Sequence, residues 1–283
     1  MIKFILAARR KPGDTQERYF YEWGIIHVAL MLTTPAVMET FRRYVQHYSI
    51  AGVTNDVLIH PLSDMGWDNM ADHWLESTDD FAPILHSQAY VERMQPHKFG
   101  DDAFNIELTS GDVVYEQDGF TPGGVKLIHF LKRKPGVSQD DFVRIWRERH
   151  APALLEAARG LLRKYVQNPQ LPLDASTFEG TLFELGGVGE YAGIEELWFD
   201  SLDDLARLRA DSAIYDAIRV SEAAFIDDAD TFSMVTTERV VYDFTHPTNP
   251  SPKPAVLDPA SLEALVDAQG YRDWNVPPGP HGR

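Results

Sequence analysis

The sequence contains two copies of one long pattern. Residues 3–23 and 126–146 share an apolar start and a Lys-Pro-Gly turn, and each closes on a Trp that is followed four positions later by a His. Two further blocks recur in the same order, around Tyr44 and Tyr165 and around Trp74 and Trp198. A repeat of this length is a duplicated domain and not a solenoid unit. We therefore expect one domain at residues 1–117, its copy at 124–244 and a Pro-rich C-terminal tail with a short helix at 245–283.

Each copy predicts the same order of elements. A helix follows the Lys-Pro-Gly turn and a second helix follows the third strand, which gives the ferredoxin-like order β-α-β-β-α-β. The predicted strands are residues 2–8, 41–47, 71–76 and 103–115 in the first copy, and 125–132, 162–168, 194–200 and 231–244 in the second. Both helices would cover one face of each sheet, so the bare faces would pair. The expected fold class is α+β, with two ferredoxin-like repeats forming an intrachain α+β barrel.

Composition excludes several classes of function. The chain has no cysteine, which excludes disulfides, thiolate catalysis and Cys-ligated metals. Its net charge of −17 argues against nucleic acid and anionic membranes as partners. No apolar run is long enough to span a bilayer, and the start has no signal-peptide pattern, so we expect a soluble, cytoplasmic protein. The tail aromatics Tyr271 and Trp274 could dock on the body or on a second subunit, which leaves a homodimer open.

The paired Trp and His residues are the leading candidates for catalysis and binding. Trp23 with His27, and Trp146 with His150, are spaced to share one helical face. A Trp in an amphipathic helix faces the sheet, which would place each His on the same inward face. Pro152 disfavours helical geometry before it, so His150 is expected in the last helical turn, where it would titrate near neutrality. The alternative is a core Trp with a His that binds a backbone carbonyl.

Further candidates lie on the predicted strands. Tyr44 and Tyr165 need hydroxyl partners, which a ligand, a histidine or a main-chain group could supply. His129 interrupts an apolar strand and is expected to line the second cavity with His150, although a satisfied core histidine is the alternative. His47, three residues after Tyr44, would lie on the opposite sheet face. We also expect Trp74 and Trp198 to bind substrate, with a core role as the alternative.

Metals and cofactors are not expected. No two histidines have the spacing of a metal-binding helix, and His27 with His47 plus a carboxylate is a trio that nothing selects. The glycines near 186–193 do not follow the layout of a nucleotide-binding loop.

The second copy resembles an EthD domain, a family of the dimeric α+β barrel superfamily. The resemblance rests on Lys-Pro-Gly at 134–136, on Trp146 to Pro152 with its His-Ala-Pro ending, and on blocks at 165–168 and 196–201. It covers about residues 124–244 and, more weakly, 1–117, where Val28-Ala29 follows His27 and the proline is missing. It implies a ligand cavity between sheet and helices. Relatives in the superfamily include cofactor-free decarboxylases, cyclases, dehydratases and monooxygenases that act on aromatic or polyketide-like compounds.

The function we expect is that of a cofactor-independent lyase, of decarboxylase or dehydratase type. Its substrate would be a small hydrophobic aromatic or polyketide-like carbonyl or carboxylate compound. His150 and His27 would act as general acid and base, supported by His129, Tyr165 and Tyr44, and the main site would lie in the second copy. The alternatives are a cofactor-free monooxygenase, a haem-binding tandem barrel and a non-catalytic small-molecule binding protein.

Overall fold

The protein has a mixed α+β fold built on one large sheet. The structure is a computed structural model that describes residues 1–94 and 99–245, so the helix predicted in the tail lies outside the described residues. One ten-stranded sheet has the order β5-β7-β9-β6-β10-β2-β3-β1-β4-β8. The strands are β1 (Ile2–Arg10), β2 (Arg43–Ser49), β3 (Asn69–Leu75), β4 (Gly100–Ser110), β5 (Asp112–Glu116), β6 (Val125–Leu131), β7 (Leu162–Pro169), β8 (Gly187–Val188), β9 (Gly193–Phe199) and β10 (Phe232–Asp243).

The strand order repeats between the two halves of the chain. β1 lies between β3 and β4, and β6 lies between β9 and β10, with antiparallel pairing throughout. β10 joins the halves by pairing with β2. The predicted strand at 103–115 is in fact two strands. The strand is interrupted at Gly111, and β5 then pairs with β7 at the other end of the sheet. The sheet therefore curls until its two ends meet.

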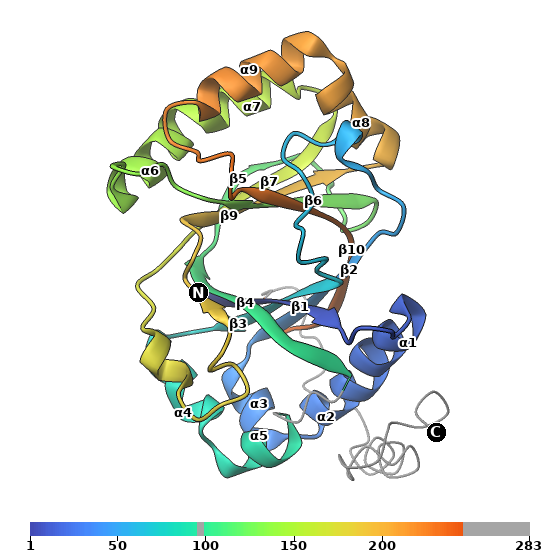
Figure 1. Ribbon diagram of the computed structural model, residues 1–283, viewed down its shortest axis with the longest axis vertical. Coiled ribbons are helices and arrows are strands. Elements are labelled where there is room, and N and C mark those ends of the chain that lie inside the picture. Colours follow the sequence, from blue (N-terminus) through green and yellow to red (C-terminus); the bar gives the residue numbers. More distant parts are fainter. Residues whose placement is uncertain (95–98, 246–283) are drawn as a thin grey trace.

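Helices cover the outside of both walls of the sheet (Figure 1). The core inside the curled sheet draws residues from both halves, such as Ile5, Met70, Ile128 and Phe232. Further apolar clusters lie between each wall and its helices. The helices are α1 (Gln16–Tyr21), α2 (Val28–Leu32), α3 (Pro35–Thr40), α4 (Phe81–Leu85), α5 (Gln88–Arg93), α6 (Gln139–Ile145), α7 (Ala151–Ala157), α8 (Leu202–Ala210) and α9 (Ser212–Glu222).

The two Trp–His pairs lie in π-helical turns, at Glu22–His27 and Trp146–His150. The prediction that the helix ends at His150 is wrong, because α7 continues directly from it. The backbone N–H of Ala151 donates to the Trp146 carbonyl, five residues back, and this wider register places Pro152 in a new first turn, where no N–H is needed. The π turn keeps each Trp and His on nearly one face.

Two loops cross between the halves (Figure 1). The loop after β2 packs Leu58 and Ile59 into the cluster beneath the helices of the second half. The loop after β7 packs Phe178 and Phe183 into the corresponding cluster of the first half. Each helix-covered interior is therefore completed by a segment of the other half.

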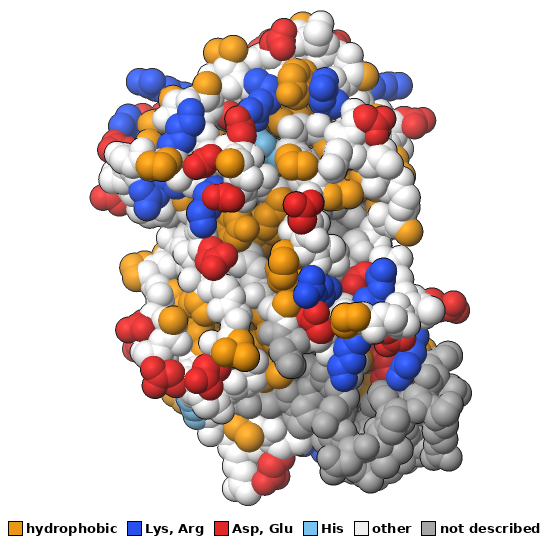
Figure 2. Space-filling model, in the orientation of Figure 1, with side chains coloured by type: hydrophobic (Ala, Val, Ile, Leu, Met, Phe, Trp, Pro, Cys, Tyr) orange, Lys and Arg blue, Asp and Glu red, His pale blue; other side chains and the backbone are white. Residues whose placement is uncertain are grey.

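The visible surface is polar and mixed in charge. Acidic and basic side chains are interspersed over both halves in Figure 2. Within the described residues, no helix has the length and apolar character that crossing a bilayer would require.

Candidate active site

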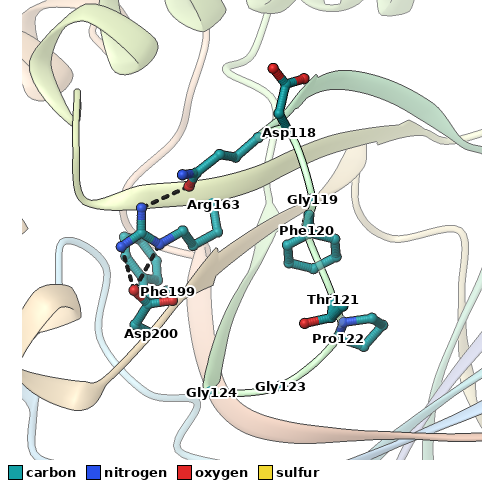
Figure 3. Close-up of a pocket in the computed structure, with 11 residues that line it drawn as sticks. Asp118, Gly119, Phe120, Thr121, Pro122, Gly123, Gly124, Arg163, Phe199 and Asp200 are labelled. Atoms are coloured by element: carbon teal, nitrogen blue, oxygen red, sulfur yellow. Dashed lines mark hydrogen bonds and ion pairs between the residues drawn. The ribbon is translucent and has the colours of Figure 1, made fainter.

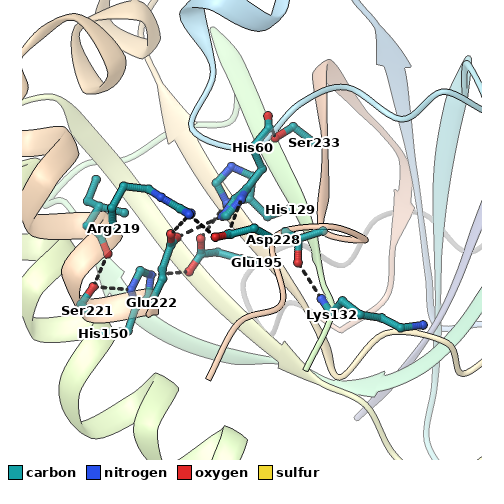
Figure 4. Close-up of polar contacts among 12 residues, drawn as sticks. His60, His129, Lys132, His150, Glu195, Arg219, Ser221, Glu222, Asp228 and Ser233 are labelled. Carbon is teal, nitrogen blue, oxygen red and sulfur yellow. Dashed lines mark hydrogen bonds and ion pairs between the residues drawn. The ribbon is translucent and has the colours of Figure 1, made fainter. Parts of the chain in front are cut away.

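A single buried carboxylate gathers most of the predicted residues of the second half. Glu195, on β9, is 1% exposed. Its Oε1 accepts hydrogen bonds from the Tyr165 hydroxyl at 2.6 Å and the Trp146 indole at 3.1 Å, and its Oε2 lies 2.9 Å from Nδ1 of His129. His150 Nε2 forms an ion pair with Oε1 at 3.3 Å (Figure 4). The sequence therefore indicated all four side chains around this carboxylate and missed the carboxylate itself.

The local fold explains why these groups converge. His129 and Glu195 are directly opposite each other on β6 and β9, and Tyr165 is on the next strand, β7. Trp146 approaches from the π turn, and Gly193 leaves room for it, because a Cβ there would lie 2.6 Å from the indole ring. The Trp146 carbonyl accepts a hydrogen bond from the Gln167 amide at 3.1 Å, which ties the π turn to β7. The site is thus fixed by three strands and one helix.

The surroundings of His150 favour its protonated form. Ser221 donates its hydroxyl proton to the Ile218 carbonyl, so Ser221 accepts from His150 Nδ1 at 2.8 Å. The other ring nitrogen faces the Glu195 carboxylate, which also calls for an N–H. Burial alone would lower the pKa of His150, but the hydrogen bond and charge of Glu195 outweigh it and raise that pKa. The imidazolium is therefore stabilised by the carboxylate and not by a helix terminus.

His129 is neutral and is held in one tautomer. Burial lowers its pKa and exceeds the opposing effect of Glu195. Because Nδ1 donates to Glu195, Nε2 carries the lone pair, and this atom has no hydrogen-bond partner among the described residues. Burial and then the charge of Glu195 raise the pKa of Tyr165, which stays a phenol. The site thus places a charged acid and a neutral base on one carboxylate.

The first half lacks this constellation. Trp23, His27 and Tyr44 hold the corresponding places, and Gln46 binds the Trp23 carbonyl and the Tyr44 hydroxyl as Gln167 binds their counterparts.

Leu6 and Ala71, however, stand where the second half has His129 and Glu195. His73 stacks on Tyr44, and burial lowers its pKa to about 4. The two copies therefore differ in the groups that would do acid–base chemistry.

Three predicted residues lie elsewhere, inside the curled sheet. Trp74 and Trp198 stack under the Lys3 and Lys126 ammonium groups. His47 is 3.3 Å from Asp72, on the sheet face opposite Tyr44. A cavity of about 110 Å³ lies beside both tryptophans. The sheet separates these three side chains from His27 and from His150.

A wider pocket of about 380 Å³ is formed by the segment that links the halves (Figure 3). Gly119, Phe120 and Pro122 line it, and Arg163 closes one side by binding Asp200 and Gln117. None of the ten predicted site residues, all within the described chain, lines this pocket. Its position gives it no link to the Glu195 site.

His60 reaches the second half on the crossing loop and was not predicted as a site residue. Its Nε2 lies 3.1 Å from Glu222 and its Nδ1 3.8 Å from Asp228 (Figure 4). The three side chains are close enough together to suggest a metal site. Arg219 already binds both carboxylates, and the carboxylates face different ring nitrogens, so the arrangement is an ion-pair network. No local sequence signal could have found His60, because only the tertiary crossing brings it here.

Comparison with known proteins bears on the fold and on the general class of the protein. The chain is 24% identical over 226 residues to "Chalcone isomerase cfoK" of Aspergillus candidus, covering 77% of this chain and 88% of that one. The fold matches a structure titled "Crystal structure study of anthrone oxidase-like protein" with a TM-score of 0.57 and 12% identity, covering 88% and 96% of the two chains. The names of these relatives are those of enzymes, and the fold is similar to the dimeric α+β barrel proteins. Residues 134–229 match the model of the EthD domain, which confirms the resemblance inferred from the sequence.

Proposed function

We propose that the protein is an acid–base enzyme of lyase type whose site is the Glu195 cluster of the second half. The observation that carries this is one buried carboxylate in contact with two imidazoles, His129 at 2.9 Å and His150 at 3.3 Å, whose surroundings shift their pKa values in opposite directions. Environments that separate the pKa values of neighbouring groups mark the acid and the base of a reaction. We also infer that the two halves are copies of one ferredoxin-like unit and that together they close an intrachain barrel.

The substrate we propose is a hydrophobic aryl ketone, in which an oxygen nucleophile adds to, or leaves from, the carbon β to the carbonyl. Chalcone isomerisation, the reaction in the name of the relative, is an intramolecular addition of this kind. Elimination of water β to a carbonyl, the dehydratase reaction, is its chemical counterpart. Neither reaction changes the oxidation state of the substrate, so one base and one acid suffice.

The roles follow from the protonation states. His129 Nε2, with its lone pair free, would take the proton of the attacking hydroxyl. The charge of the His150 ring would stabilise the developing enolate oxygen, and Nε2 would exchange its contact with Glu195 for one with the substrate when it returns a proton. Tyr165 and Trp146 both donate to Glu195 and so fix the carboxylate that orients the two imidazoles. These side chains are at most 1% exposed, so α7 and α9 would have to separate to admit substrate.

Cyclisation of 2′-hydroxychalcone to a flavanone tests this proposal. We expect the protein to accelerate loss of chalcone absorbance, to yield one flavanone enantiomer and to consume no dioxygen. Anthrone with an oxygen electrode serves as the second arm, because the cofactor-free monooxygenase is the rival reading. Oxygen uptake with anthrone, without acceleration of the chalcone reaction, would show that the protein is a monooxygenase and not a lyase. Racemic flavanone at the uncatalysed rate would reject the proposal.

A further inference from the structure

The Glu195 site is buried, but a line of titratable groups runs from it to the surface. Asp228 has 55% of its side chain exposed, whereas His60 and Glu222 are each 1% exposed. The His60 ring lies beside both carboxylates, with a different nitrogen nearest to each. The His60 ring also lies 4.9 Å from the His129 ring, centroid to centroid and at a right angle.

We propose that His60, supplied by the first half, works with Glu222 and Asp228 as a proton relay between the Glu195 site and solvent. His60 is thus a positioning residue that acts through other groups. The inference rests on the proposed acid–base function, because only a reaction that moves protons needs such a path. It also explains why the crossing loop carries a histidine, where an apolar residue would have served packing alone.

The need for a path follows from the reaction. In each turnover the base gains a proton from the substrate while the acid gives one up, so both must be reset. Glu195 touches both imidazoles, but it and the four side chains around it are at most 1% exposed, so it gives neither imidazole a path to water. The route from the site to water passes Glu222, whose negative charge favours the protonated forms of both His129 and His150 by raising their pKa values.

The transfer balances within the network. A proton bound by Asp228 passes to His60 Nδ1, and His60 Nε2 releases its own proton to Glu222 over 3.1 Å. Glu222 then gives this proton to the imidazole of the site that has lost one, and the same steps in reverse return a proton to water and restore the His60 tautomer. The 3.8 Å gap to Asp228 is too long for a direct hydrogen bond, and a water molecule or a rotation of this exposed side chain would close it. Arg219, which donates to Glu222 at 2.6 Å and also binds Asp228, holds both carboxylates beside the His60 ring.

The position of His60 is fixed by its backbone. Its carbonyl accepts a hydrogen bond from the Ser233 hydroxyl at 2.7 Å, and the adjacent Pro61 carbonyl accepts from the Ser233 N–H at 2.7 Å. Leu62 forms a bridge with the same strand, β10. His60→Gln should therefore leave the loop in place while it removes the second ring nitrogen, which the relay requires.

The test measures proton exchange directly and does not depend on any substrate. In protein labelled with ¹⁵N at the histidine rings, we would follow exchange of the His150 ring N–H protons with water by NMR. His60→Gln is expected to slow this exchange about 10²-fold, the low end of what a positioned acid or base contributes. Asp228→Asn, at the surface, should slow it less, and added imidazole should restore it in His60→Gln. His86→Gln is the matched control, since this exposed histidine lies in the first half against the Thr177 carbonyl.

Unchanged exchange in His60→Gln and Asp228→Asn, with both variants folded, would overturn the relay. Equal slowing in His60→Gln and His86→Gln would overturn it too, because the effect would then be unspecific. If His60→Gln does not fold, the rate of proton exchange in Asp228→Asn alone decides whether the relay stands. Slowed exchange in a protein that does not convert 2′-hydroxychalcone would leave the relay standing and reject the proposed function. Turnover of 2′-hydroxychalcone, together with proton exchange that neither variant slows, would reject the relay and leave the proposed function standing.

Discussion

Replacing Glu195 by glutamine should separate catalysis from stability. The glutamine keeps the shape of the side chain but offers one oxygen and one NH₂ group to donors that now bind two oxygens. If the oxygen stays with Tyr165 and Trp146, the NH₂ group faces His129 Nδ1, which must then accept. His129 would move its proton to Nε2, the atom proposed as base. His150 would lose its counter-charge and release its proton. His129 would then be in the wrong tautomer to act as the base, and His150 would have lost the proton that it needs to act as the acid.

The magnitudes follow from these losses. A positioned acid or base contributes about 10²–10⁴-fold to a rate, so turnover of 2′-hydroxychalcone should fall by at least the lower figure. Removing one partner of a buried ion pair costs about 3–5 kcal/mol. A domain is typically stable by about 5–15 kcal/mol, so the variant should still fold at room temperature.

The neighbouring residue provides the matched control. Glu196 is equally buried, on the same strand, but points into the curled sheet, where it binds Lys3 and Lys126 at 3.2 Å each. Glu196→Gln should lose a comparable free energy of unfolding in guanidinium and keep turnover within a few-fold. If Glu195→Gln folds and keeps turnover, or if both variants lose it equally, the site is not where we place it.

Three further predictions use the asymmetry between the halves. His150→Ala should lower turnover about 10²–10⁴-fold, whereas His27→Ala should leave it within a few-fold; the opposite result, with both folded, would place the site in the first half. Phe178→Ala should cost about 3–5 kcal/mol in thermal or chemical unfolding without loss of turnover, because Phe178 fills the first-half core against Phe81. His73, buried with a pKa of about 4, binds fewer protons folded than unfolded between about pH 6.5 and 4. The wild type should therefore lose up to about 3 kcal/mol as pH falls through this window, and His73→Leu should not; parallel pH–stability curves would contradict this.

Sequence reasoning reached the site only in part, and the reasons are physical. Trp146 and His150 could be found because their spacing places them on one helical face, and His129 because a histidine in an apolar strand requires a partner. The end of the helix at His150 was mispredicted, because Pro152 is accommodated by a shift of hydrogen-bond register that no local preference reveals. Trp74, Trp198 and His47 lie away from the site because alternation along a strand puts them on the inner face of the sheet.

A comparison of the two copies contains the signal for Glu195. His129 replaces Leu6, and Glu195 replaces Ala71, so two polar residues appear in the same copy at positions that the strand register places side by side. A single buried polar residue is costly, and a second one opposite it removes that cost by a hydrogen bond. Two costly changes that satisfy each other indicate a selected pair more strongly than either residue alone. On the duplication that we propose, the first half keeps an apolar core, filled by Phe178 and Phe183, that stabilises the whole chain, and this leaves the second half free to hold a buried charge network.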